Sequence, residues 1–413
     1  MGYTKEAIKG ISWVGAFRLS TRFITLLRTA ILARILSPAQ FGVFGIASLL
    51  LGLVEMLTET GINVFLVQEA DDAHKYLNTA WMVSIMRGIL ISAVIILSAG
   101  LVSNFFNSPD SYNLLLLMSL VPFIRGFINP AVVKFQKDLQ FNKEFWFRFT
   151  VFAIDSFTTI ILAFLTRSTA SLIWGFIAGA IAEVVLSFVV MRPTPKVIFE
   201  LEKAKRIFSR GKWMTAAGIF NYLFYNGDNI VVGRLLGLPS LGIYQMGYRI
   251  STIPISEVAD VVSRVTFPVY VKIAGDSSRL RRAFTKTIIV ISLICIPFGL
   301  ILFVFPEQIV KLLLGDQWLD VIPLLRILAI FGIIRAISTS TSSVFLALKK
   351  QEYVTVLTLF GILGLGISIV PLINQYGIVG ASMAAFVGSI AALPPIFYYT
   401  WKVFSNKKEK NNI

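Results

Sequence analysis

The stretch ISWVGAFRLSTRFITLLRTAILARIL (11–36) is long and apolar enough to cross a membrane as a helix, yet it carries Arg18, Arg22 and Arg28. At 1.5 Å per residue this helix exceeds the roughly 30 Å of bilayer hydrocarbon, and Arg22 lies near its middle. A charge at that depth costs about 2.5 to 3.5 kcal/mol on insertion scales. At about 100° per residue the three arginines share one broad face, which therefore cannot face lipid. We predict that this face lines a wet, cationic cavity that receives an anion.

The whole chain has the composition of a polytopic membrane protein, because 56% of its 413 residues are hydrophobic and only 15% are charged. The first apolar segment is too long and too rich in arginine for a signal peptide, so we predict that it is the first permanent span. Cys295 is the only cysteine, which excludes an internal disulfide, and the single His74 excludes a histidine-based metal site. We expect no cofactor. The formal charge of +16 is typical of orienting loop lysines and arginines, and we expect no nucleic-acid partner.

Twelve apolar segments predict an all-α polytopic membrane protein with about twelve transmembrane helices. Turn signals separate the segments, among them Ser37-Pro38, 107–110 and 237–240. No stretch alternates like the strand of a transmembrane barrel. The segments are residues 11–35, 41–67, 79–103, 112–133, 145–166, 170–191, 208–235, 242–271, 284–305, 321–347, 353–373 and 378–401. Loop lysines and arginines fall mostly on one side, which predicts a cell (inner) membrane protein with both termini in the cytoplasm.

An internal repeat divides the chain into two halves. LARILSPAQFGVFGIA (32–47) aligns with VGRLLGLPSLGIYQMG (232–247), so that Arg34 meets Arg234. Two six-span halves that enter from the same side form a parallel repeat, and such repeats place the substrate site at their mutual interface. The predicted domains are an N-terminal six-helix lobe (1–191), a basic cytoplasmic linker (192–207) and a C-terminal six-helix lobe with a short basic tail (208–413).

The predicted linker is amphipathic, and we expect it to lie at the cytoplasmic surface of the membrane. Its basic residues either set the topology of the chain or recognise particular lipids. The sequence favours the first interpretation.

The turn ILARILSPAQFGVFGIA, its copy in the second half and the arginines of the first span resemble the Wzx-type polysaccharide flippases. These belong to the multidrug/oligosaccharidyl-lipid/polysaccharide (MOP) exporter superfamily, which also holds the lipid II flippases and the MATE drug exporters. The resemblance covers essentially the whole chain. It implies two six-helix lobes around a central cavity that opens alternately to the two faces of the membrane.

The resemblance also implies the substrate. Wzx-type flippases move a lipid-diphosphate-linked oligosaccharide, carried on a polyprenyl diphosphate, in the biosynthesis of cell-surface polysaccharide such as lipopolysaccharide O-antigen. The implied partners are this lipid-linked substrate, the lipid bilayer and the polysaccharide assembly machinery. We expect a monomeric transport unit.

Arginines in the spans are the predicted diphosphate-binding groups, because a guanidinium bonds two phosphate oxygens and stays charged at any working pH. The predicted contacts are Arg18, Arg22, Arg28, Arg249, Arg264 and Arg335. For the first three, the alternative is structural pairing with an acid such as Asp228 or Glu59. For Arg249 and Arg264, a salt-bridge ladder with Glu257 and Asp260 inside one lobe is an equal alternative.

Other polar side chains complete the predicted site. Those expected to contact the sugars or line the cavity are Asn221, Tyr225 and Asn229. Those expected to serve coupling or charge balance are Asp228, Glu55, Glu59 and Asp260. Glu55 and Glu59 either pair with arginines or take up a coupling proton.

Three other classes of function fit the sequence less well. A drug or cation exporter on the same scaffold needs an acidic cavity, and residues 11–36 contain no acid. A membrane glycosyltransferase or polymerase needs a large outer loop or a cluster of catalytic carboxylates, and the longest outer loop, 306–321, carries only Glu307, Asp316 and Asp320. A structural or assembly protein gives no reason to place arginines in the bilayer. We therefore predict a flippase, not an enzyme, and expect no catalytic residues.

Overall fold

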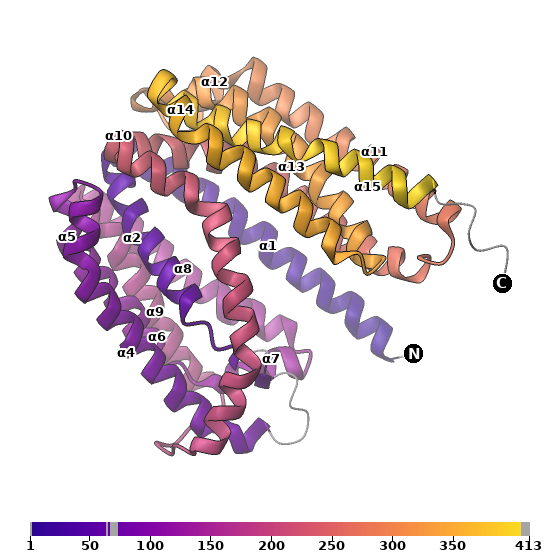
Figure 1. Cartoon of the computed structure of the whole chain (residues 1–413). Coiled ribbons are helices and arrows are strands. Elements are labelled where there is room, and N and C mark those ends of the chain that lie inside the picture. Colours follow the sequence, from indigo (N-terminus) through magenta and orange to yellow (C-terminus); the bar gives the residue numbers. More distant parts are fainter. Residues whose placement is uncertain (1, 63–64, 67–72, 406–413) are drawn as a thin grey trace. The chain divides into compact units, whose positions relative to one another are not determined.

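The computed structural model of the chain describes residues 2–62, 65–66 and 73–405 (Figure 1). Within the helices, the side chains of residues 2–12, 14, 16–19, 73–74, 207–221, 223–224 and 253 lie outside this description. The chain forms two compact units: unit 1 comprises Met1–Gly227 with Gly237–Pro239, and unit 2 comprises Asp228–Leu236 with Ser240–Ile413. The chain passes from one unit to the other within α10 (Leu201–Lys272), first between Gly227 and Asp228. The predicted boundaries of the lobes at 191 and 208 remain a prediction.

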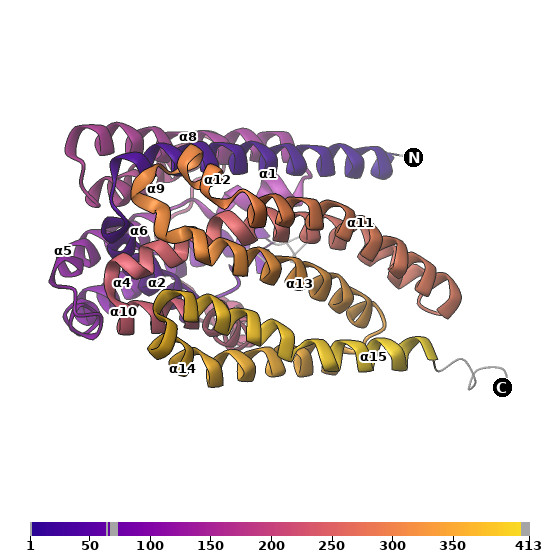
Figure 2. The same cartoon turned by 90° about the horizontal axis from the view of Figure 1, so that it is seen from above.

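Unit 1 is a bundle of helices, and its described residues contain no strand. Its elements are α1 (Gly2–Ile35), α2 (Pro38–Leu57), α4 (Ala73–Phe105), α5 (Pro109–Met118), α6 (Leu120–Arg125), the 3₁₀ turn η1 (Pro130–Val133), α7 (Lys134–Lys137), α8 (Phe141–Thr166), α9 (Ala170–Val190) and the first part of α10 (Leu201–Lys272). Helices α1 and α8 lie side by side, as Figure 2 shows, and α8 packs against α9.

Local sequence explains where the first helices begin and end. Ser37 begins α2 through a capping box: its hydroxyl accepts the backbone N–H of Gln40, and the Gln40 side chain accepts the backbone N–H of Ser37. The predicted turn at Ser37-Pro38 is thereby confirmed. The helix ends at Leu57, before the predicted residue 67, because Thr58 closes its last turn and the polar sequence that follows leaves the helix.

The predicted segment 112–133 is broken in the structure. The part Pro109–Arg125 and the part Pro130–Lys137 are bent by 71° relative to each other. Pro130 cannot donate a backbone hydrogen bond, and the Asn129 side chain accepts the N–H of Ala131 to start the new turn. This break forms one wall of the charged pocket described below.

Unit 2 is also helical throughout its described residues. Its elements are the later part of α10, then α11 (Ser277–Val304), α12 (Pro306–Leu313), the 3₁₀ turn η2 (Asp316–Val321), α13 (Ile322–Ala347), α14 (Gln351–Ala391) and α15 (Leu393–Ser405). Helix α13 packs against both α11 and α14. Asp276 caps α11, and hydrogen bonds from the backbone N–H of Arg279 and from Ser278 lower the pKa of its carboxyl group.

Two glycines break the longest helices of the chain. Gly237 in α10 has φ 80° and ψ −175°, and Gly377 in α14 has φ 58° and ψ −134°. These backbone conformations suit glycine because it has no Cβ. At 1.5 Å per residue, 72 residues of α10 would reach about 108 Å as one straight helix, far more than a bilayer. The breaks lie at the predicted turn 237–240 and between the last two predicted segments.

The described helices confirm an all-α polytopic membrane protein. Seven of them are long and apolar enough to cross a membrane, or up to eight if the bent pair near Pro130 counts as one span. Large apolar side chains lie exposed on these helices, such as Leu97 at 80% and Leu165 at 76%, as expected for surfaces that face lipid. Helix α1 is not among the seven, and its arginines recur at short intervals. The predicted count of twelve spans and the two-lobe repeat remain predictions.

Candidate functional site

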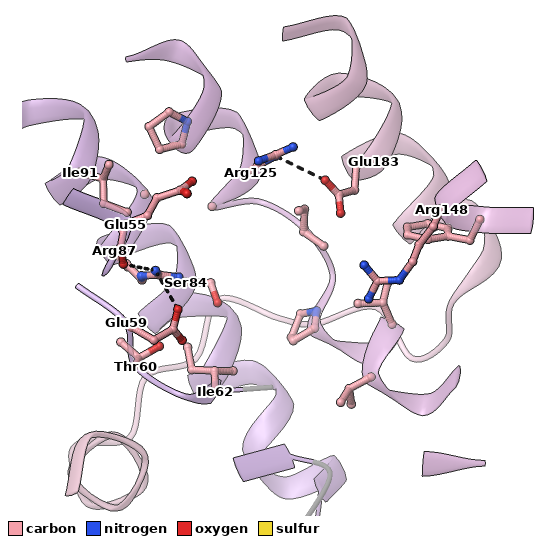
Figure 3. A pocket seen from close by; sticks show the side chains of 18 of the residues that line it. Glu55, Glu59, Thr60, Ile62, Ser84, Arg87, Ile91, Arg125, Arg148 and Glu183 are labelled. Carbon is pink, nitrogen blue, oxygen red and sulfur yellow. Dashed lines mark hydrogen bonds and ion pairs between the residues drawn. The ribbon is translucent and has the colours of Figure 1, made fainter. Parts of the chain in front are cut away.

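A charged pocket of about 300 Å³ lies inside unit 1 (Figure 3). Its ionisable lining consists of three arginines and four glutamates from five parts of the chain. These side chains are Glu55 of α2, Glu59 just after α2, Arg87 of α4, Arg125 of α6, Glu144 and Arg148 of α8, and Glu183 of α9. With every group ionised, the carboxylates exceed the guanidinium groups by one. Such a lining is too polar for a lipid tail, and the pocket is large enough to hold several water molecules.

Three ion pairs run around this pocket. Arg87 lies 3.3 Å from Glu59, Arg125 lies 3.5 Å from Glu183, and Arg148 lies 2.8 Å from Glu144. The side chains are partly exposed, and pairs of that kind contribute about 0 to 1 kcal/mol each. The pairs can therefore exchange partners at little cost when one of the groups changes its charge.

Glu55 stands apart from these pairs. Its backbone carbonyl accepts a hydrogen bond from Arg87 at 2.8 Å, but among the described residues its carboxylate forms no ion pair. Figure 3 shows that the carboxylate extends into the pocket on the side of Arg125. The structure places the predicted residues Glu55 and Glu59 in one pocket, Glu55 on α2 and Glu59 just beyond its end. It adds three arginines and Glu183, which sequence analysis did not assign to the site.

A second cluster in unit 1 holds Arg28 of α1 against α8. Its guanidinium donates to Asp155 at 2.8 Å, to Thr159 at 3.0 Å and to Ser156 at 3.5 Å. The Arg28 and Asp155 side chains are only 11% and 12% exposed, so this is a buried ion pair. Arg28 thus pairs with an acid, as the structural alternative required, although the acid is neither Asp228 nor Glu59.

A third cluster lies in unit 2 around the buried Asp228. One carboxylate oxygen accepts the hydroxyl of Tyr244 at 2.8 Å. The other accepts the backbone and side-chain N–H groups of Asn229, at 2.8 and 3.0 Å. The structure thereby brings together two residues of the predicted site, Asp228 and Asn229. Three donors satisfy the Asp228 carboxylate, and the Tyr244 hydroxyl joins the part of α10 before Gly237 to the part that follows it.

Arg335 of α13 extends the third cluster. Its guanidinium contacts the hydroxyl of Tyr248 and lies 5.9 Å from the centre of the Tyr248 ring and 5.8 Å from that of Phe331. The Tyr248 ring lies next to the ring of Tyr244, with 6.3 Å between their centres. Two tyrosines of α10 therefore connect Arg335 to Asp228. Sequence analysis did not identify either tyrosine, although Tyr244 aligns with Phe44 in the repeat.

The second and third clusters hold their buried charges at equivalent positions of the predicted repeat. Arg28 and Asp228 are separated by the same interval as Arg34 and Arg234. In unit 1 this position carries a cation that is held by an acid. In unit 2 it carries an anion that is held by a tyrosine and an asparagine. The predicted repeat thus matches a buried cation in unit 1 with a buried anion in unit 2.

The remaining predicted residues are not brought together within one unit. Arg22 and Tyr225 are exposed in unit 1, Asp260 and Arg264 are exposed in unit 2, and Arg249 is half-buried there. The side chains of Arg18 and Asn221 lie outside the described residues.

Replacing Tyr244 with phenylalanine is expected to destabilise unit 2 by about 1 to 3 kcal/mol, because the buried Asp228 carboxylate loses a donor. Thermal unfolding of the purified protein in detergent measures the loss. Tyr398 of α15 is exposed, so Tyr398→Phe is the matched control and should unfold like the unchanged protein. An unchanged unfolding temperature for Tyr244→Phe would show that the hydroxyl does not stabilise Asp228.

Comparison with known proteins identifies the family. A family profile described as polysaccharide biosynthesis protein matches residues 31–323. The lipopolysaccharide biosynthesis protein WzxC of Escherichia coli is 26% identical over 354 residues, which are 85% of this chain and 72% of that protein. The teichuronic acid biosynthesis protein TuaB of Bacillus subtilis is 25% identical over 358 residues, covering 84% of this chain and 73% of that protein.

Two solved structures show the fold. The lipid II flippase MurJ, in an inward closed conformation, superposes with a TM-score of 0.77 and 18% identity over 96% of this chain and 89% of MurJ. An inward-facing multidrug resistance MATE family transporter of the MOP superfamily superposes with a TM-score of 0.70 and 16% identity, over 94% of this chain and 96% of that one. These two likenesses show a shared fold, while the family profile and the relatives confirm the resemblance to polysaccharide biosynthesis proteins such as WzxC. Because the profile matches well over half of the sequence, the chain belongs to the polysaccharide biosynthesis protein family.

Proposed function

We propose that this protein is a flippase that moves a lipid-diphosphate-linked oligosaccharide across the cytoplasmic membrane by alternating access, for the biosynthesis of a cell-surface polysaccharide. Its relatives are named for lipopolysaccharide biosynthesis, teichuronic acid biosynthesis and succinoglycan transport. Its fold is shared with a lipid II flippase and with MATE transporters. The relatives and the structural neighbours both support the proposal of a transport protein, which neither makes nor breaks a covalent bond.

The single observation that carries the proposal is the exposed guanidinium of Arg22. It lies in α1 beside apolar side chains that are also exposed, among them Phe23 at 63%. A cation at this depth needs water or an anion around it. The oxygens of a diphosphate match the fork of a guanidinium, so an exposed arginine in this helix suits a substrate of that class.

We propose that the arginines of the predicted set share the diphosphate. Arg18, Arg22, Arg249 and Arg264 contact it directly. Arg28 and Arg335 are already engaged by Asp155 and by Tyr248, and they add positive charge from fixed positions. Asn221, Tyr225 and Asn229 contact the sugars or line the cavity.

We propose charge balance for Asp228, whose carboxylate already accepts three donors. Coupling is assigned to Glu55, whose carboxylate lies in the charged pocket beside exchangeable ion pairs. Glu59 assists Glu55 through its ion pair with Arg87 in the same pocket. Asp260 contributes a negative charge on the exposed face of α10. The protein is a multi-pass membrane protein. We further propose that it lies in the inner membrane as a monomeric transport unit, with both termini in the cytoplasm, next to polysaccharide assembly machinery.

Replacing Arg22 with alanine is expected to lower transport of the lipid-linked oligosaccharide at least tenfold, because the diphosphate loses one of its direct cations. The protein is reconstituted into liposomes with a fluorescent lipid-diphosphate oligosaccharide, and the label that reaches the far leaflet is measured. Arg22→Lys keeps the charge but loses the two-pronged guanidinium. Its transport should therefore lie between that of Arg22→Ala and that of the unchanged protein. Arg326→Ala is the matched control, since Arg326 is an exposed arginine near the start of α13 and outside the predicted set.

Two results would count against this proposal. One is full transport by correctly inserted Arg22→Ala protein, which would remove Arg22 from the substrate path. The other is a change in the mass of the labelled substrate after incubation with the unchanged protein, which would indicate chemistry instead of transport.

A further inference from the structure

The segment between α9 and α10 presents apolar side chains outside the spans. Four large apolar side chains are exposed here: Val197 at 76%, Ile198 at 43%, Phe199 at 45% and Leu201 at 59%. Three of them precede α10, and Leu201 is its first residue. Side chains of this size, gathered within five residues, mark a surface that meets another apolar phase. We call Val197, Ile198, Phe199 and Leu201, with the basic residues Arg192 and Lys196, the linker surface.

The linker surface is held in place by the start of α4. The backbone N–H of Lys196 donates to the Asn78 side chain at 2.8 Å, and the backbone N–H of Glu200 donates to the Thr79 hydroxyl at 3.4 Å. The Lys203 ammonium donates to the backbone carbonyl of Lys75 at 2.9 Å. Figure 1 shows α10 beginning at the end of unit 1 where α4 also begins. The apolar side chains are therefore presented from a fixed backbone.

Positive charge surrounds these apolar side chains. Residues 192–206 contain five basic and two acidic side chains, a formal surplus of three. The two acids are already paired, since Glu200 lies 2.6 Å from Lys203 and Glu202 lies 2.9 Å from Lys205. Lys134 of α7 adds a further ammonium group beside the linker surface, because it donates to the backbone carbonyl of Arg192 at 2.9 Å.

The linker surface also continues the lipid-facing side of α9. Val185, Val189 and Val190 at the end of that helix are exposed by 54%, 68% and 49%. The chain leaves the bilayer at Val190 and passes through Arg192 to the exposed apolar group within a few residues. An apolar group with flanking cations at this depth matches the boundary between acyl chains and phosphate headgroups.

We propose that the linker surface is a docking site for anionic phospholipids. Val197, Phe199 and their neighbours insert between the headgroups, while Arg192 and Lys196 bind the lipid phosphates. The proposal depends on unit 1 alone and is independent of which substrate the protein transports.

The experiment measures how deeply a label at residue 197 enters the membrane. Cys295 is buried and is replaced by alanine, so that Val197→Cys carries the only reactive thiol and is labelled with bimane. The protein is reconstituted into vesicles of phosphatidylcholine alone or with phosphatidylglycerol, each containing a lipid with a shallow doxyl quencher. We expect at least twofold stronger quenching with phosphatidylglycerol, and we expect Arg192→Gln with Lys196→Gln to lower it to the value in phosphatidylcholine.

Two matched controls isolate the linker surface. Arg281→Gln with Arg282→Gln removes the same charge from the exposed start of α11 and should leave the quenching unchanged. A label at Phe199→Cys repeats the measurement should the first position perturb the fold. Absence of quenching at both positions would overturn the proposal, because the segment would then face water or a protein. Quenching that is equal in the two lipids, or unaffected by the loss of Arg192 and Lys196, would overturn the role of the anionic headgroup.

Discussion

Replacing Arg28 with alanine is expected to destabilise unit 1 by about 3 to 5 kcal/mol, because it leaves Asp155 as a buried charge without its cation. The loss of stability is large because the neighbouring hydroxyl groups of Thr159 and Ser156 are neutral and cannot replace the cation. It should appear as a lower unfolding temperature in detergent and as less protein in the membrane fraction. The effect is one of stability, distinct from the loss of transport expected at Arg22.

The double variant Arg28→Ala with Asp155→Ala provides the control. Removing both charges eliminates the unpaired carboxylate, so the double variant should be more stable than Arg28→Ala alone. If the double variant loses the sum of the two single losses, Arg28 and Asp155 do not stabilise each other, and the buried pair has no energetic role.

Replacing Gly42 with alanine is expected to disrupt packing in unit 1 more than most single methyl additions. A Cβ at Gly42 would overlap the backbone carbonyl of Leu238. Adding atoms to a packed interior costs about 1 to 3 kcal/mol, and the cost rises when the obstacle is backbone that cannot rotate away. We expect a lower unfolding temperature and a larger loss for Gly42→Val than for Gly42→Ala.

Gly100 of α4 offers the matched control for Gly42. Nothing lies within 4 Å of a Cβ placed at Gly100, which is also a helical glycine. Gly100→Ala should therefore leave the protein unchanged or slightly more stable, because alanine favours the helix. Equal behaviour of Gly42→Ala and Gly100→Ala would contradict the close approach of α2 to Leu238.

Much of the fold could be predicted from the sequence because transmembrane helices appear in it as long apolar runs. The turns at Ser37-Pro38 and at 237–240 were also readable, since proline, glycine and capping residues act locally. The break near Pro130 and the early end of α2 at Leu57 were not predicted. After α2 the polar residues 58–60 interrupt the apolar run only briefly before Ile62, and near Pro130 the apolar run continues past the end of the helix. Hydropathy alone therefore extends both segments too far.

The contacts of the candidate site were harder to predict from the sequence, because ion pairs join residues that are far apart in the chain. Arg28 and Asp155 are 127 residues apart, and no periodicity connects them. The polar neighbours Ser156 and Thr159 on the same face of α8 were the available signal that Asp155 receives a partner. Glu55 and Glu59 line the same pocket because they are close in sequence at the end of α2. Their arginines come from α4, α6 and α8, and only the folded chain brings them to the same pocket.

The opposite charges at Arg28 and Asp228 restrict which substitutions each position tolerates. Each buried charge depends on partners within its own unit: Asp155 holds Arg28, whereas Tyr244 and Asn229 hold Asp228. An aspartate at position 28 would lie opposite the Asp155 carboxylate and repel it, and an arginine at position 228 would remove the carboxylate to which Tyr244 and Asn229 donate. The two side chains are therefore exchangeable only together with the residues that hold them.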